Sequence, residues 1–443
     1  MKKRKSLFLC ALIILPLLMS CKSTASKRAP LYQQIDEAVS QGRYDQGVET
    51  LEMEKEKIYR NLDIILYYLD KGMLAHFAED YKDSIDLLQD GERAIEEAFT
   101  RSVTLEVSTY IVNDTTQEYP GEDYEDIYIN AFNALSYYHL GNLESAMVEV
   151  RRMSNKLRFL SSKYGVVTSN MQKKALEDSA EIPPNEDIGS VQFTDSALAR
   201  YLGMLFYRAQ GDWDDARIDR DDIKIAIANA PRVYTFPAPQ SIDEELEVPP
   251  DKARLNIIGF CGLPPIKQQK DIRIPLPGAR WAKIALPVLV QRPSQVGRIE
   301  VLVNGEQFNL EPLENMGAVA GETFKEREKV IYLKSVLRGT IKGVAVAATN
   351  EAGKRVGGVA GVALQLGSLA GQVAAEASEQ ADLRMSRYIP AMAYVGGITV
   401  DPGIYDIQVT YYSQSGSVLA RYAREDVLIE SGALNLQEFI CLK

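Results

Sequence analysis

The spacing of apolar residues changes once along this chain of 443 residues, and the change restricts the fold more than any other feature. From Leu31 to about Pro231, apolar residues recur every three or four positions, as they do in amphipathic helices. A stretch rich in proline and acidic residues follows, and beyond it apolar and polar residues alternate as in strands. Proline fixes φ and removes a backbone donor, so this stretch ends the helical region. The sequence therefore predicts an α+β, multidomain chain with a helical domain (31–232), a stiff acidic linker (233–253) and a β-rich domain (254–443).

One short pattern returns four times in the helical half. Each copy is a tight turn, then an aromatic residue or Leu, then a small residue three positions later. The copies begin at Gly42, Glu79, Gly141 and Gly211. This pattern resembles the tetratricopeptide repeat, which implies an α-α superhelix whose concave face binds peptides or proteins. The small residues are 37, 62 and 70 positions apart, against about 34 in that family, so the array is degenerate and a plain helical bundle is the alternative.

The residues beyond the linker predict a β-sandwich. Candidate strands span 255–261, 281–290, 298–303, 307–310, 398–400, 404–411 and 434–442. The run Asp401-Pro402-Gly403-Ile404-Tyr405 resembles the final hairpin of carbohydrate-binding or transthyretin-like sandwiches.

A helical hairpin is predicted as an insertion in this domain, at about 323–378. Residues 323–349 form an amphipathic pattern, and residues 356–375 are uncharged and rich in Gly and Ala. The second segment is less apolar than the roughly 20 strongly apolar residues that a spanning helix needs. We expect it to be buried or to touch a membrane, with a true membrane span as the alternative.

The N-terminus predicts export and a lipid anchor. Four basic residues at positions 2–5 precede an uncharged apolar run at 7–19, which is typical of a secretory signal. The segment Leu18-Met19-Ser20-Cys21 resembles a bacterial lipobox. The resemblance implies cleavage between Ser20 and Cys21, a lipid on the Cys21 sulfur and a tether at 21–30; an ordinary secretory signal at 1–20 is the alternative.

The expected location follows from this anchor. Lys22 follows the lipidated cysteine, and resemblance to enterobacterial lipoproteins then implies the outer membrane, facing the periplasm. Removal of residues 1–20 takes the net charge from −11 to −15, because that segment carries four basic residues and no acidic ones. Such a charge argues against nucleic acid as a partner and leaves the lipid as the contact with the membrane. After cleavage and lipidation, Cys261 and Cys441 are the remaining cysteines. They either form a disulfide or stay as two buried free thiols.

Two segments carry candidate site residues. The polar loop at 109–125 contains a Pro-Gly turn, and Tyr119, Gly121, Asp123 and Tyr124 are its candidate partner-binding residues. The alternative for its acidic residues is capping of the helix that follows. Near the C-terminus, Asp382 and Arg384 alternate along an extended segment and are expected to form a structural ion pair, with a ligand site as the alternative.

The sequence gives little sign of catalysis. His76 and His139 have no partner at metal-ligand spacing, no phosphate loop is complete, and we expect neither a metal, nor a cofactor, nor an enzyme.

Three runs of the mature chain resemble a family of uncharacterised bacterial lipoproteins. They are Tyr119-Pro120-Gly121-Glu122-Asp123-Tyr124-Glu125, Ala282-Lys283-Ile284-Ala285-Leu286-Pro287 and Glu379-Gln380-Ala381-Asp382-Leu383-Arg384. The expected function is a membrane-anchored scaffold for protein partners in the envelope, such as a peptidoglycan synthase or an outer-membrane assembly factor, with peptidoglycan as a further contact. The alternative is a cell-wall-active or ligand-binding protein with its site in the C-terminal domain.

Overall fold

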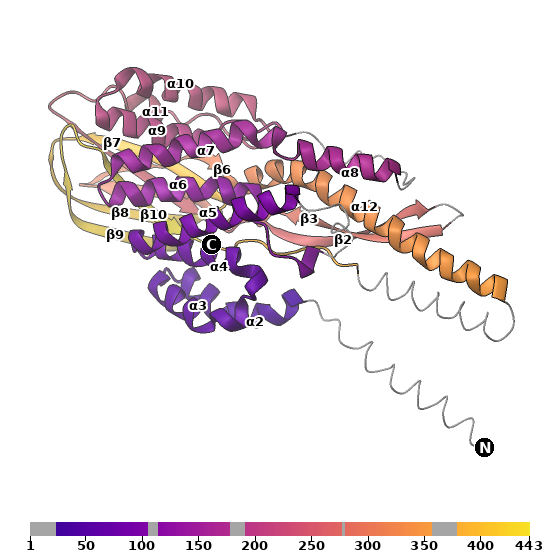
Figure 1. Cartoon of the computed structure of the whole chain (residues 1–443). Helices are drawn as coiled ribbons and strands as arrows, with labels where there is room; N and C mark the ends of the chain where they lie inside the picture. The colour runs from indigo at the N-terminus through magenta and orange to yellow at the C-terminus, as the bar shows by residue number, and fades with distance from the viewer. Residues whose placement is uncertain (1–23, 105–113, 178–190, 277–279, 357–378) are drawn as a thin grey trace.

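The computed structural model describes residues 24–104, 114–177, 191–276, 280–356 and 379–443, and it has the predicted α+β composition. The helices are α2 (Thr24–Ser40), α3 (Tyr44–Ile58), α4 (Ile64–Phe77), α5 (Tyr81–Thr104), α6 (Asp123–His139), α7 (Leu143–Lys163), α8 (Gly165–Glu177), α9 (Ala197–Gln210), α10 (Trp213–Asn229), α11 (Ser241–Glu244) and α12 (Met316–Val356). In Figure 1 the helices from α2 to α10 lie side by side, largely in chain order, over the strands.

The four repeated turns lie where the sequence places them, between α2 and α3, α4 and α5, α6 and α7, and α9 and α10. All four first residues, Gly42, Glu79, Gly141 and Gly211, have φ between 63° and 81°. Glycine adopts this left-handed conformation without steric cost, and it often ends a helix, so the pattern records a real backbone requirement. The small residue of each copy is buried, which lets the two helices of the pair approach.

The strands form two four-stranded sheets and one hairpin. They are β1 (Ala253–Cys261), β2 (Ile266–Leu276), β3 (Arg280–Val290), β4 (Val296–Val303), β5 (Glu306–Asn309), β6 (Glu311–Asn315), β7 (Met392–Val400), β8 (Gly403–Ser413), β9 (Val418–Ile429) and β10 (Asn435–Cys441). One sheet has the order β10-β1-β7-β6, with β1 and β10 parallel, and the other has the antiparallel order β5-β4-β8-β9. Among the described strands, β2 and β3 pair only with each other.

Strand β1 lies in the middle layer of the molecule and is buried at every position. Successive strand residues point to opposite faces, so its two sets of side chains meet different neighbours. Phe260 and Ile258 pack with the helices, and the Phe260 ring lies 5.2 Å from that of Phe132 on α6. Leu255 and Ile257 instead pack against residues of β4 and β8. The layers are therefore helices, sheet and sheet.

Helix α12 and the β2–β3 hairpin extend together from one end of the molecule (Figure 1). One part of the α12 surface packs on Ile274, Ile284 and Leu286 of the hairpin. Another part packs on Val167 and Met171 of α8. Helix α12 begins seven residues before the predicted 323, and residues 357–378 of the predicted insertion lie outside the described residues. Among the helices that the structure describes, none has the length and apolarity needed to cross a bilayer.

The stretch 233–253, expected to be a stiff linker, packs against both halves. Glu245 is fully buried and accepts hydrogen bonds from Arg208 of α9 at 2.5 Å and from Asn256 of β1 at 2.7 Å. Helices and strands also share one continuous hydrophobic core. The sequence pattern could not reveal this packing, because a stretch rich in proline and acidic residues looks the same whether it is a free linker or packs against its neighbours.

Candidate functional site

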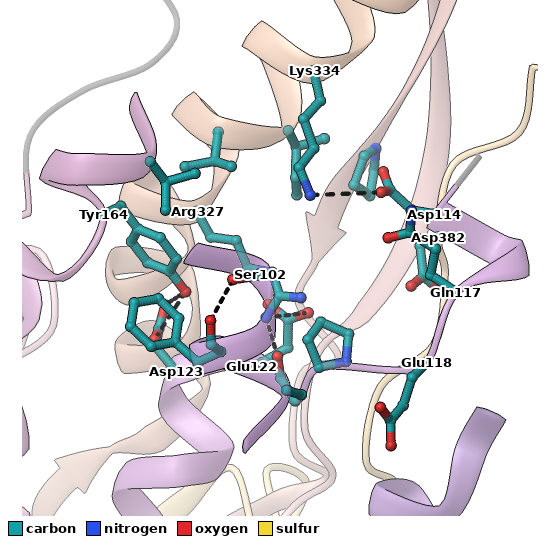
Figure 2. A pocket seen from close by; sticks show the side chains of 18 of the residues that line it. Ser102, Asp114, Gln117, Glu118, Glu122, Asp123, Tyr164, Arg327, Lys334 and Asp382 are labelled. Carbon is teal, nitrogen blue, oxygen red and sulfur yellow. Dashed lines mark hydrogen bonds and ion pairs between the residues drawn. The ribbon is translucent and has the colours of Figure 1, made fainter. Parts of the chain in front are cut away.

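A cavity of about 430 Å³ lies where the end of α5, the start of α6, the end of α7 and α12 meet the β2–β3 hairpin (Figure 2). Much of its wall is apolar. The apolar lining residues include Ile95, Ala98 and Phe99 of α5, Val167 of α8, and Val330 and Ile331 of α12. Cavities of this size accept a small molecule or a few side chains of a partner.

Three distant sequence segments meet at this cavity. They contribute Pro120–Asp123, then Ala285 with Pro287, and then Gln380–Asp382. These are parts of the same three runs that carry the lipoprotein resemblance. More than 250 residues separate the first from the last, so only the tertiary fold brings them together.

Gly121 fixes the course of the loop at the cavity wall. Its φ is +75°, and a Cβ there would lie 2.6 Å from Cγ1 of Ile95. Both facts disfavour any larger residue at this position, because its backbone would be strained and the Ile95 side chain would have to move. Immediately afterwards, the backbone N–H of Glu122 donates to the Glu125 carboxylate at 2.8 Å, so an acidic side chain does cap the start of α6.

Charged side chains surround the apolar wall, and they form ion pairs with one another. The Lys163 ammonium lies 2.7 Å from the Asp123 carboxylate, which also accepts a hydrogen bond from the Tyr164 hydroxyl at 3.0 Å (Figure 2). Glu122 pairs with both Lys267 and Arg327, and Arg327 also donates to the carbonyl of Gly121. These pairs anchor α7, α12 and the hairpin to the start of α6.

Lys334 stands at the opposite wall of the cavity, 3.9 Å from the Asp114 carboxylate. Burial lowers the pKa of Lys334, and the nearby positive charges of Arg327 and Arg338 lower it further, while Asp114 acts in the opposite direction. The Lys334 ammonium is therefore poorly hydrated, and carboxylates as well as cations line this end of the cavity.

The four predicted loop residues divide into two pairs. Gly121 and Asp123 line the cavity. Tyr119 and Tyr124 are buried in the core, and the Tyr119 hydroxyl donates to Glu125 at 2.8 Å. The prediction that these two tyrosines face a partner is therefore wrong, because their rings complete the hydrophobic core instead.

The predicted ion pair of Asp382 and Arg384 is present, with Nη2 and Oδ2 2.7 Å apart. Arg384 also pairs with Asp63 at 3.0 Å, and it donates to the carbonyl groups of Leu62, Gln117 and Asp114. It therefore fixes one end of the cavity loop to the helical layer.

The cysteines give a mixed result. Cys261 and Cys441 lie opposite each other in the parallel strands β1 and β10, and both are buried free thiols. Burial raises the pKa of Cys261 to about 12 and that of Cys441 to about 11, so both are neutral near pH 7. Ser20 and Cys21 lie outside the described residues.

Sequence reasoning missed the cationic residues of the cavity. On α12, Arg327, Val330, Ile331 and Lys334 follow the spacing i, i+3, i+4, i+7, which places them on one helix face and could have been noticed. Lys267 gave no such signal, because it lies on the unpredicted strand β2.

The chain's two histidines meet at one carboxylate. His76 Nε2 lies 3.2 Å and His139 Nε2 2.5 Å from the oxygens of Glu438 on β10. Burial raises the pKa of Glu438, but the two imidazole groups outweigh it and lower the pKa to about 2. This cluster joins α4 and α6 to the sheet.

The pH dependence of stability is expected to report on Glu125, whose carboxyl is buried beside the cavity loop. Burial first, and the charge of Glu122 second, raise its pKa from 4.5 to about 7. Because the folded-state pKa is raised, its contribution to stability is complete below about pH 4.5 and is lost as the pH rises through 7. Glutamine does not titrate, so the wild type loses this contribution as the pH rises and Glu125→Gln does not. We therefore expect the unfolding free energy of Glu125→Gln minus that of the wild type to increase by on the order of 3 kcal/mol between pH 4.5 and 8.

Urea unfolding at several pH values would measure this difference. The matched control is Glu97→Gln, whose side chain is 70% exposed, and its curve should run parallel to that of the wild type. A Glu125→Gln curve that is also parallel would contradict the prediction.

Comparisons with protein-family models, with curated proteins and with solved structures found no match for this chain.

Proposed function

We propose that this protein is a lipid-anchored adaptor of the bacterial cell envelope that binds a protein partner at the cavity beside α12. One observation carries the proposal: three segments far apart in the chain converge on an apolar cavity surrounded by charges. An apolar centre with a polar rim is the usual arrangement of a protein-binding hot spot. The anchor would be Cys21 after cleavage of residues 1–20, and the site would face the periplasm from the outer membrane.

The arrangement of the layers supports an adaptor. The successive helix pairs α2–α3, α4–α5, α6–α7 and α9–α10 fit a tetratricopeptide-like superhelix, and the two packed sheets fit a β-sandwich with α12 inserted. Such a fold offers an extended surface for a protein partner. The cavity carboxylates Glu122 and Asp123 are already neutralised by cations, which favours binding over acid–base chemistry.

The partner can be tested by photo-crosslinking in intact cells. Benzoylphenylalanine would replace Phe99, which lines the cavity, and as a matched control Trp213, which is 44% exposed at the start of α10. We expect a discrete crosslink to an envelope protein from position 99, lost when Ala98→Leu fills the cavity, and no such crosslink from position 213. Equal patterns at both positions would refute the proposed site, provided that Ala98→Leu unfolds at the same temperature as the wild type.

The anchor is tested separately by labelling cells with a palmitate analogue. The wild type should take up the label and Cys21→Ala should not. Equal labelling would remove the lipid anchor from the proposal.

A second candidate is a ligand-binding or cell-wall-active protein. The buried ammonium of Lys334 in the cavity wall favours it, because an anionic group of a wall fragment could contact this ammonium. If position 99 yields no crosslink and the purified protein binds or processes wall fragments, this second candidate replaces the adaptor.

A further inference from the structure

The outer part of the β2–β3 hairpin has two different faces. Its apolar face, which includes Ile274 and Ile284, packs against α12. Arg273 lies directly opposite Lys283 in the hairpin, and Trp281 is two positions from Lys283 along β3. Because alternate residues of a strand point to the same side, these three residues share the face that turns away from α12.

This second face is open to solvent toward the tip of the hairpin. Trp281 is 58% exposed, and Arg273 is exposed beside it. Lys283 is partly exposed and pairs with Asp271 at 2.9 Å. Nearer the body of the molecule the same face is covered, and Pro287 lines the cavity proposed for the partner there. The tip therefore presents an indole ring and two basic side chains together at the surface.

The charge of this projection is opposite to that of the chain as a whole. The outer part of the hairpin, residues 270–283, contains four basic residues and one acidic residue. The last part of α12, residues 339–356, extends from the same end of the molecule and adds three basic residues and one acidic residue (Figure 1). The chain from Cys21 onward has a net charge of −15. The strongly acidic total thus conceals a basic end that an anionic surface would attract.

The proposed lipid anchor would hold this same end of the molecule near a bilayer. Cys21 is only three positions before Thr24, the first residue of α2. In Figure 1 the first turn of α2 lies toward the side from which the hairpin and α12 extend. A lipid on Cys21 and the tip of the hairpin can therefore reach one membrane surface.

We propose that the tip of the β2–β3 hairpin contacts an anionic phospholipid surface through Trp281, Arg273 and Lys283. Tryptophan favours the membrane interface, because its apolar ring enters the headgroup region while its N–H stays hydrated. Each basic residue near an anionic surface strengthens binding about fivefold. This contact rests on the proposed lipid anchor, and it would fix the direction in which the anchored protein presents its cavity.

Fluorescence quenching can test the contact, because Trp213 and Trp281 are the two tryptophans of the chain. The full lipidated protein would be reconstituted into vesicles of equimolar phosphatidylcholine and phosphatidylglycerol with brominated acyl chains. Trp213→Phe leaves the hairpin tryptophan as the only one, and Trp281→Phe leaves the matched control on α10, which is 44% exposed. We expect the vesicles to quench Trp281 and not Trp213. Pure phosphatidylcholine vesicles should quench Trp281 much less.

The basic side chains are tested in the variant that keeps Trp281 alone. Arg273→Gln together with Lys283→Gln should weaken the contact about twentyfold and abolish most of the quenching. Arg217→Gln together with Lys224→Gln removes two basic residues from the surface of α10 and should leave the quenching unchanged. All four side chains lie at least partly exposed, so these variants should unfold at the temperature of the wild type.

Two results would overturn the proposal: Trp281 quenched no more than Trp213, or quenching that depends neither on phosphatidylglycerol nor on the basic residues of the hairpin. Flotation of the same vesicles reports on the anchor separately. Protein that floats without quenching of Trp281 would refute the contact and keep the anchor. Protein that carries no lipid but is quenched by anionic vesicles would support the contact and remove the anchor.

Discussion

Replacing Arg384 by Met is expected to lower the free energy of unfolding by about 3–5 kcal/mol. The Arg384 side chain is only 9% exposed, and it joins the carboxylates of Asp382 and Asp63. Its remaining N–H groups donate to backbone carbonyls at positions 62, 114 and 117. Without the guanidinium group, Asp382 loses its ion-pair partner, Asp63 is left with Arg60, and the cavity loop loses its attachment to the helical layer.

Urea unfolding of the full chain would measure the loss. Arg298→Met is the matched control, because Arg298 pairs with Glu300 at a surface where its side chain is 45% exposed, and we expect a loss of at most about 1 kcal/mol there. Arg384→Lys keeps the charge but cannot reach as many acceptors, so it should lie between the two. If Arg384→Met costs no more than Arg298→Met, the anchoring role assigned to Arg384 is wrong.

Replacing Glu314 by Ala is expected to cost a similar amount, about 3–5 kcal/mol. Glu314 lies on β6, is fully buried, and accepts hydrogen bonds from Tyr128, Ser196 and Tyr234 at 2.5 to 2.9 Å. It also accepts the backbone N–H of Leu198 in the first turn of α9 at 2.9 Å. Burial raises the pKa of Glu314, and these donors act in the opposite direction. Alanine would leave several buried donors unpaired between the helices and the sheet.

The isosteric variant Glu314→Gln distinguishes the loss of hydrogen-bond acceptors from the loss of side-chain volume. Glutamine keeps one acceptor oxygen but turns an N–H₂ group toward other donors, so we expect an intermediate loss of about 1–3 kcal/mol. Glu306→Ala, at an exposed strand position, should change the unfolding free energy by less than about 0.5 kcal/mol. Equal midpoints for Glu314→Ala and Glu306→Ala in thermal unfolding would show that this network does not link the two layers.

The local patterns predicted the elements that local forces control. The repeated turns coincide with four left-handed residues, three of which are glycines, and glycine adopts this conformation without steric cost. Strands β1, β4 and β8 were found from their apolar alternation. Strands β2, β6 and β9 were missed: β2 contains the polar run Lys267 to Asp271, and β9 alternates charged with apolar residues on an exposed face. Such strands depend on pairing and packing with neighbours that the sequence does not identify.

The candidate site shows the same division. The loop at 119–124 and the Asp382–Arg384 pair were noticed because proline, glycine and alternating charges leave a local signature. Which loop side chains face the cavity was predicted wrongly for the tyrosines, because burial depends on what packs from elsewhere in the chain. Lys267 and Lys334 reach the cavity from β2 and α12, which are far from that loop in sequence.

By itself, then, the sequence determined the α+β composition, the four helix pairs with their turns and the ion pair at 382–384, because each depends on residues close together in the chain. Only the tertiary structure decided that the proline-rich stretch is docked, that both histidines meet Glu438, and that three distant runs line one cavity. Those features depend on contacts between residues tens to hundreds of positions apart, which form only when the apolar faces of the helices and of β1 are buried together.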